Sequence, residues 1–249
     1  MKHPRPGLLP GGARGRKRFG FVLAGLWLAG IVVAVAVLRP PFLPAGSAEA
    51  PADAHASDAG VRLVPADWSG SSPGPYTIEV VLALDETWEA ALGNDAATTA
   101  MAVIGKANDR LAPGGLQLEV VSIERWGHTG PGASTRELLR DLERRVEAPS
   151  RGLVIGLAGE AAGATTDGLA RRHGRHLVVH RHPGQVELDG YVLTHELGHI
   201  LGLHHHDCPD DACFMASHGY DPRRHWCDEH LTLLRANAGY FSYLADGGN

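Results

Sequence analysis

A short segment of this chain combines histidines, a glutamate and a glycine at a spacing that suits zinc chemistry. It begins at His195 and reads H-E-L-G-H-I-L-G-L-H-H, which fits the pattern H-E-x-x-H-x-x-G-x-x-H. His195 and His199 share one face of a helix and can therefore bind the same metal ion. Glu196, beside them, is placed to accept a proton from water. Gly202 favours a sharp turn at the end of that helix, which brings His205 back as the third ligand.

The glycine and the third histidine make this motif specific. The chain has 15 histidines, most of them in its C-terminal third, so a loose histidine-rich metal-binding surface is an alternative interpretation. Such a surface needs neither Glu196 nor Gly202, and the full pattern favours an ordered three-histidine site. His204 and His206 flank His205 and remain alternative third ligands, but the spacing favours His205.

The cysteines of the chain and one further histidine form a second candidate metal site. Cys208 and Cys213 lie close together in the sequence, and Cys227 and His230 follow as a second close pair. Two such pairs are typical of a closed, tetrahedral structural zinc site with three cysteines and one histidine. In an exported protein, a disulfide between Cys208 and Cys213 with Cys227 free is the alternative, and buried reduced thiols are a third interpretation.

Together these residues resemble the archaemetzincins, within the metzincin clan of zinc peptidases, over residues 195–230. The resemblance implies that the three motif histidines bind a catalytic zinc ion, with Glu196 as general base. It implies that a second, structural zinc ion is bound by the three cysteines and His230. It also places Met215, which follows Cys213 after one residue, in the turn beneath the catalytic metal.

The chain departs from the archaemetzincin pattern at three places. Two residues, His206 and Asp207, separate the third histidine from the first cysteine, and the spacing from Met215 to Cys227 is shorter than is usual in the family. His230 stands where the family has a fourth cysteine. Imidazole is a competent zinc ligand, although His230 can also be read as a surface residue that opens the last helix.

The N-terminal part of the chain differs in composition from the rest. Residues 1–18 are basic, and residues 19–38 form an uncharged apolar run of the length of one transmembrane helix. Positive charge before this run predicts a single-pass membrane protein whose following domain is exported. The alternative is that this segment is a signal peptide, cleaved near Ala50, and that the protein is secreted. Residues 39–75 contain seven prolines and are expected to form a linker, followed by the metallopeptidase domain over 76–249.

Charge excludes one class of partner. The whole chain carries a net charge of −5, and the seven Lys and Arg residues among its first fifty positions all lie outside the expected domain. An acidic domain without a basic stripe is a poor nucleic-acid binder. The expected partners are a peptide or protein substrate and, through the N-terminal helix, a membrane.

Hydrophobic periodicity predicts a three-layer α/β domain, with a helix that carries His195. Strands are expected over 76–84, 116–123, 152–157 and 176–179, and helices over 95–111 and 135–146. The resemblance adds a mixed sheet, an active-site helix and a small C-terminal subdomain. It also implies that the strand near 176–181 is the sheet edge beside the cleft, where an extended peptide can pair.

The resulting hypothesis is a zinc-dependent endopeptidase or aminopeptidase-type peptide hydrolase. Zinc makes water acidic enough to act as a nucleophile near neutral pH, and Glu196 takes up the proton and passes it to the leaving amine. One alternative is a non-catalytic, membrane-tethered zinc-binding module. Another is a zinc hydrolase of a non-peptide acyl bond, since the same groups activate water for esters and other amides.

Overall fold

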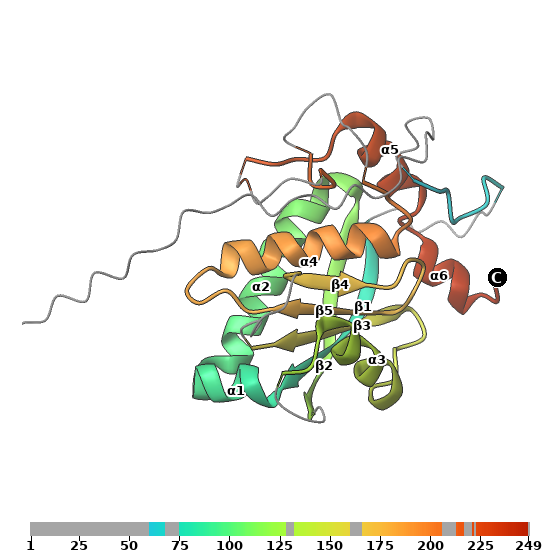
Figure 1. Cartoon of the computed structure of the whole chain (residues 1–249). Helices are drawn as coiled ribbons and strands as arrows, with labels where there is room; N and C mark the ends of the chain where they lie inside the picture. Colours follow the sequence, from blue (N-terminus) through green and yellow to red (C-terminus); the bar gives the residue numbers. More distant parts are fainter. Residues whose placement is uncertain are drawn as a thin grey trace, which may run out of the picture. The chain divides into compact units, whose positions relative to one another are not determined.

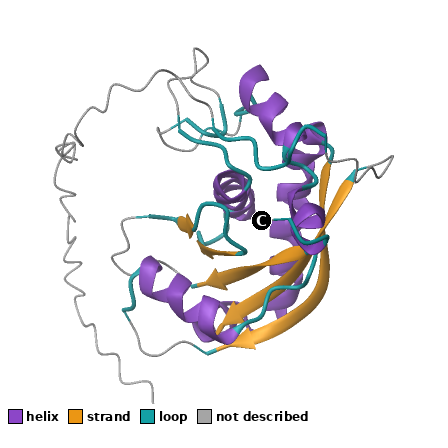
Figure 2. Cartoon of the chain, turned by 90° about the vertical axis from the view of Figure 1, so that its right-hand side faces the viewer, coloured by secondary structure: helices purple, strands orange, loops and turns teal. Residues whose placement is uncertain are grey.

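A twisted sheet with helices on both faces forms the centre of the fold (Figure 1). The computed structural model describes residues 60–67, 75–127, 132–159, 166–205, 213–216, 221 and 223–248. Figure 2 shows the helices on the two sides of the sheet. The expected three-layer α/β domain with a mixed sheet is therefore present in the described residues.

The sheet has five strands in the order β2-β1-β3-β5-β4. Four of them are mutually parallel, and β4 at the edge runs antiparallel to β5. Parallel neighbours need crossover connections, and helices supply those from β1 to β2 and from β2 to β3. The strand bounds are β1 Tyr76–Asp85, β2 Leu116–Trp126, β3 Gly152–Ala158, β4 Gly168–Ala170 and β5 His176–His180.

The helices divide between two hydrophobic cores, one on each face of the sheet. Residues of α2 and α4 pack with alternate side chains of β1 on one face, and α3 packs on the other face beside Trp126. Ser134 and Glu137 form a capping box at the start of α3, which satisfies backbone N–H groups there. The helix bounds are α1 Glu86–Leu92, α2 Ala96–Leu111, α3 Thr135–Arg145, α4 Val186–Ile200, α5 Asp228–Ala236 and α6 Tyr240–Ala245.

The strand near 176–181 is not the sheet edge, so that prediction is wrong. This strand, β5, lies between β3 and β4, and both Val178 and Val179 are fully buried. The edge strand is β4, which has only three residues. A strand of three residues carries no usable periodicity, which is why the sequence did not indicate it.

Residues 60–67 differ from the linker expected over 39–75, because they pack against the end of α4. Gly60 pairs with Leu203, and the N–H of Val61 donates to the carbonyl of Gly202 at 2.8 Å. The buried side chain of Asn237 accepts from the N–H of Leu63 and donates to the carbonyls of Val61 and Leu201. This part of the expected linker is thus fixed to the domain.

No helix among the described residues is long and apolar enough to cross a membrane. The segment 19–38, which is expected to do so, lies outside the described residues, as does the basic segment before it.

Replacing Asn237 by alanine should destabilise the domain. The change leaves one buried N–H and two carbonyls without their partner, and each lost hydrogen bond of this kind costs about 1 kcal/mol. We expect the free energy of unfolding to fall by about 2 to 4 kcal/mol, measured by urea denaturation. Thr232→Ala on α5 is the control, because that exposed hydroxyl donates only to a carbonyl of its own helix. Equal effects of the two changes would contradict this role of Asn237.

Candidate active site

The helix α4 carries the motif and ends in the turn that the sequence predicted. Gly202 has a φ of +82°, in the left-handed region that favours glycine. The N–H of Leu203 donates to the carbonyl of Gly198, and the N–H of Gly202 donates to that of His199, which is the Schellman arrangement. This turn reverses the chain direction immediately before His205.

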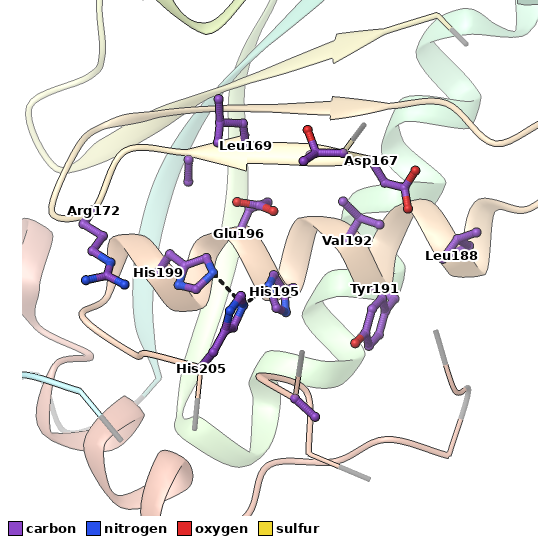
Figure 3. A pocket seen from close by; sticks show the side chains of 14 residues that line it. Asp167, Leu169, Arg172, Leu188, Tyr191, Val192, His195, Glu196, His199 and His205 are labelled. Carbon is purple, nitrogen blue, oxygen red and sulfur yellow. Dashed lines mark hydrogen bonds between the residues drawn. The ribbon is translucent and has the colours of Figure 1, made fainter. Parts of the chain in front are cut away.

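The three motif histidines come together at one point of the cleft. His205 Nε2 lies 2.9 Å from His195 Nε2 and 3.2 Å from His199 Nε2. Figure 3 shows the three side chains pointing toward one another, with Glu196 nearby on the side of β4. Nitrogen atoms at this separation can bind a single zinc ion at about 2.0–2.1 Å. His205, and not His204, is the histidine grouped with the helical pair, while His206 lies outside the described residues.

Backbone carbonyls orient the two helical histidines. His195 Nδ1 donates to the carbonyl of Phe214 at 2.8 Å, and His199 Nδ1 donates to that of Leu203 at 3.0 Å. A carbonyl only accepts, so the proton sits on Nδ1 and the Nε2 lone pair of a neutral ring faces the cleft. Such outer hydrogen bonds are typical of metal-bound histidines.

Burial keeps these rings neutral. It lowers the pKa of His199 to about 3, with a smaller contribution from the neighbouring histidines. It likewise lowers the pKa of His205 to about 4 and holds the pKa of His195 below its usual range. Neutral imidazole is the form that binds a metal ion.

Glu196 lies between α4 and the edge strand. Burial raises the pKa of its carboxyl group to about 7, and a hydrogen bond from the backbone of Ala170 acts in the opposite direction. A Cβ atom at Gly168 would lie 2.9 Å from Glu196 Cγ and 2.7 Å from a methyl group of Val192. The absence of a side chain at Gly168 therefore lets β4 approach the glutamate.

Met215 lies against the backbone of α4, fully buried. A Cβ atom at Gly198 would lie 2.7 Å from Met215 Sδ, so the absence of a side chain at this glycine lets the methionine pack against the helix. Phe214, next to it, supplies the carbonyl that orients His195. Met215 thus packs against α4 at Gly198, and its role beneath a metal ion stays a prediction.

Two residues that the sequence analysis did not single out fasten this turn. The buried guanidinium of Arg224 donates to the hydroxyl of Tyr191 at 2.8 Å and to the carbonyls of Cys213 and Ala216. Tyr191 in turn donates to the carbonyl of Phe214. Arg224 stands next to Arg223 and belongs to no motif, so no spacing could have indicated it.

The cleft beside the histidines has a volume of about 530 Å³. Its walls come from β4 with its flanking residues, from α4 and from Ala216. Apolar side chains of Leu188, Tyr191 and Val192 line one end, and Arg172 lies at the other. Asp167, Gly168 and Arg172 had no motif around them, so only the fold brings them to the site.

The second candidate site is also assembled, as far as the described residues extend. His230 Nδ1 lies 3.1 Å from the sulfur of Cys213 and 3.2 Å from that of Cys227. Cys208, the third cysteine, lies outside the described residues. His230 is fully buried, which rules out the reading of it as a surface residue. Two sulfurs and an imidazole nitrogen form a donor set that suits zinc.

One hydrogen bond connects the two candidate metal sites. His230 Nε2 donates to the carbonyl of His204 at 2.9 Å, and His204 immediately precedes His205. With this proton on Nε2, the Nδ1 lone pair of the neutral ring faces the two thiols, as a metal ligand must. The side chain that completes one site thus holds the backbone beside a ligand of the other.

Comparison with known proteins supports the fold. No protein-family model matches the chain. No curated protein matches it either. A solved archaemetzincin from Methanopyrus kandleri is 23% identical, with a TM-score of 0.50 over 66% of this chain and 97% of its own.

A second solved structure, described as a chaperone–substrate complex, is 17% identical with a TM-score of 0.50. The match covers 67% of this chain but only 34% of that one, so the chain spans about a third of its length. At these identities the comparisons show the fold alone. The fold resembles that of the solved archaemetzincin.

If each cluster binds one zinc ion, the two ions should be lost separately. We expect elemental analysis of the full-length chain to give two zinc ions per molecule, with one lost in His195→Ala and the other in Cys227→Ala. His176→Gln is the control, because that ring bonds the carbonyl of Val146 outside both clusters. A single ion that is lost only in His195→Ala would contradict the second site.

Proposed function

We propose that this chain is a zinc-dependent peptide hydrolase with Glu196 as general base. The observation that carries the proposal is the convergence of three histidine nitrogens beside a buried glutamate in an open cleft. Neutral rings with their outer nitrogens bonded to carbonyls suit a resident zinc ion held by His195, His199 and His205. The fold adds support, because it resembles that of a solved protein named as an archaemetzincin.

Each part of the site has a role in hydrolysis. Zinc, when bound, supplies a Lewis acid that polarises a carbonyl and makes water more acidic. Glu196 accepts the proton of the attacking water and then donates it to the leaving amine. Its raised pKa suits both transfers, because a group that titrates near neutral pH can accept and release a proton readily.

The free edge of β4 favours peptides over other acyl substrates. Along an antiparallel strand, successive residues direct their N–H and C=O groups alternately toward and away from the partner strand. The carbonyl of Asp167 accepts from the N–H of His180 in the sheet, so Gly168 and Ala170 direct their backbone groups away from β5. An extended peptide can pair with such an edge through main-chain hydrogen bonds. An ester or a small amide lacks the repeated groups that would make these bonds.

Glu196→Gln should abolish peptide hydrolysis while zinc is retained. We expect a loss of at least about a hundredfold in kcat/KM, the usual contribution of a general base. In the wild type, kcat/KM should fall as the pH is lowered, because protonated Glu196 cannot accept a proton. The midpoint should lie between 4.5 and about 7, since bound zinc favours the carboxylate and so lowers its pKa.

The matched control is Glu187→Gln, also on α4. Glu187 is half exposed and pairs with Lys106 and Arg110 outside the cleft. Its loss should leave kcat/KM and the pH profile nearly unchanged. Retained peptidase activity in Glu196→Gln would overturn the assigned role, and turnover of esters without peptides would favour the alternative acyl hydrolase.

We propose further that residues 19–38 anchor the chain in a membrane, with the domain exported. The proposal rests on the uncharged apolar run and on the basic residues before it. Full-length chain expressed in bacteria should then stay in the membrane fraction after alkaline extraction and lose its domain to protease added outside. A shorter protein that starts after residue 50 and stays in solution would instead indicate a cleaved signal peptide.

A further inference from the structure

We propose that the cleft selects extended peptides by charge, with an acidic side chain before the scissile bond and a basic one after it. The inference rests on the proposed peptidase function and names its substrate class. It derives from two opposite charges, Arg172 and Asp167, that lie beyond the two ends of the edge strand β4. Figure 3 shows Arg172 beside His199 and Asp167 above the N-terminal half of α4.

Arg172 is available to a ligand. It is exposed, lines the cleft and makes no ion pair with another described residue, whereas Arg171 pairs with Glu143 at 2.8 Å outside the cleft. In the cleft it lies at the same end as His199 and His205. A carboxylate near the catalytic centre would therefore meet an unpaired guanidinium.

The side chain of Asp167 is held in place by His182. His182 Nε2 lies 3.2 Å from its carboxylate, and His182 Nδ1 lies 2.8 Å from the buried carboxylate of Asp189. The Asp167 side chain is nevertheless 63% exposed, so it can also accept from a cation in the cleft. The neighbouring wall is apolar, with Leu188 and Val192, and suits the stem of a lysine or arginine side chain.

The direction of the peptide follows from pairing with β4. Antiparallel pairs outnumber parallel ones, and β4 offers the outward N–H and carbonyl of Gly168 and the outward carbonyl of Ala170, whose N–H donates to Glu196. A peptide that runs antiparallel to β4 has its earlier residues near Arg172 and its later residues near Asp167. Glu196 lies against the strand between them, so the scissile bond falls between the two charged positions.

This arrangement also favours one mode of cleavage. A free peptide N-terminus carries a positive charge, and an antiparallel substrate would place it on the side of Arg172. Repulsion there disfavours removal of single N-terminal residues. Of the two modes that the sequence left open, the cleft favours the endopeptidase over the aminopeptidase type.

The test uses two internally quenched peptides with the same composition, one with Glu before and Lys after the central bond and one with the two exchanged. Zinc-loaded full-length wild type should cleave the first with a kcat/KM about tenfold higher, since each exposed charge pair contributes up to about fivefold. Arg172→Glu together with Asp167→Lys should reverse the preference. Arg151→Glu, at an exposed arginine outside the cleft, should leave it unchanged.

Binding gives a readout that needs no turnover. In the Glu196→Gln background, fluorescence anisotropy of the same two peptides with a label should show the same order of affinities, and the Arg172→Glu and Asp167→Lys changes should reverse it. Cleavage with no charge preference, or a preference that survives the double change, would overturn this inference alone. Failure of wild type to cleave any peptide would overturn the proposed function and this inference with it.

Discussion

The abrupt end of α4 is the constraint on which the geometry of the metal site depends. The helix places two histidines on one face, but a straight continuation would carry His205 away from them. The turn at Gly202 reverses the chain, and the carbonyl of Leu203 within it also orients His199. Asn237 and the segment 60–67 bind the turn from outside. Backbone geometry therefore fixes His205 beside the two helical histidines.

The edge strand imposes a second constraint, on Glu196, the proposed general base. With β4 close to α4, Glu196 is shielded from water and its carboxylate keeps a backbone donor at Ala170. Burial of a carboxyl group without a cationic partner disfavours its charged form, and this costs folding free energy at neutral pH. In the proposed hydrolysis, the same burial would give the carboxyl group the proton affinity of a general base, at the expense of folding stability.

The sequence predicts those parts of the molecule whose signals are local. The long strands and α2, α3 and α4 follow from periodicity, and Gly202 follows from the conformation that its turn requires. The edge strand was misassigned because β4 has three residues, while β5 is apolar enough for either place in the sheet. Asp167, Arg172 and Arg224 act through neighbours distant in sequence, and no spacing rule describes such contacts.

The burial of His230 is another feature that the sequence alone could not predict. Its sequence position, near the start of a helix, fits an exposed residue as well as a ligand. What decides between these is packing: the ring is enclosed, with one nitrogen toward two sulfurs and the other toward a carbonyl. That environment forms only when the C-terminal segment folds, so it could not be predicted from the residues next to His230 in the sequence.

The bond from His230 to the carbonyl of His204 has a thermodynamic consequence for metal loading. An ion bound by His230 would also restrict the position of the His204 backbone, and therefore that of His205, which follows it. Coupling free energy between two binding sites is reciprocal. If occupancy of the cysteine cluster raises the affinity of the histidine site by some factor, occupancy of the histidine site raises that of the cluster by the same factor. The two ions would then be taken up cooperatively, and a chelator that extracts one would loosen the hold on the other.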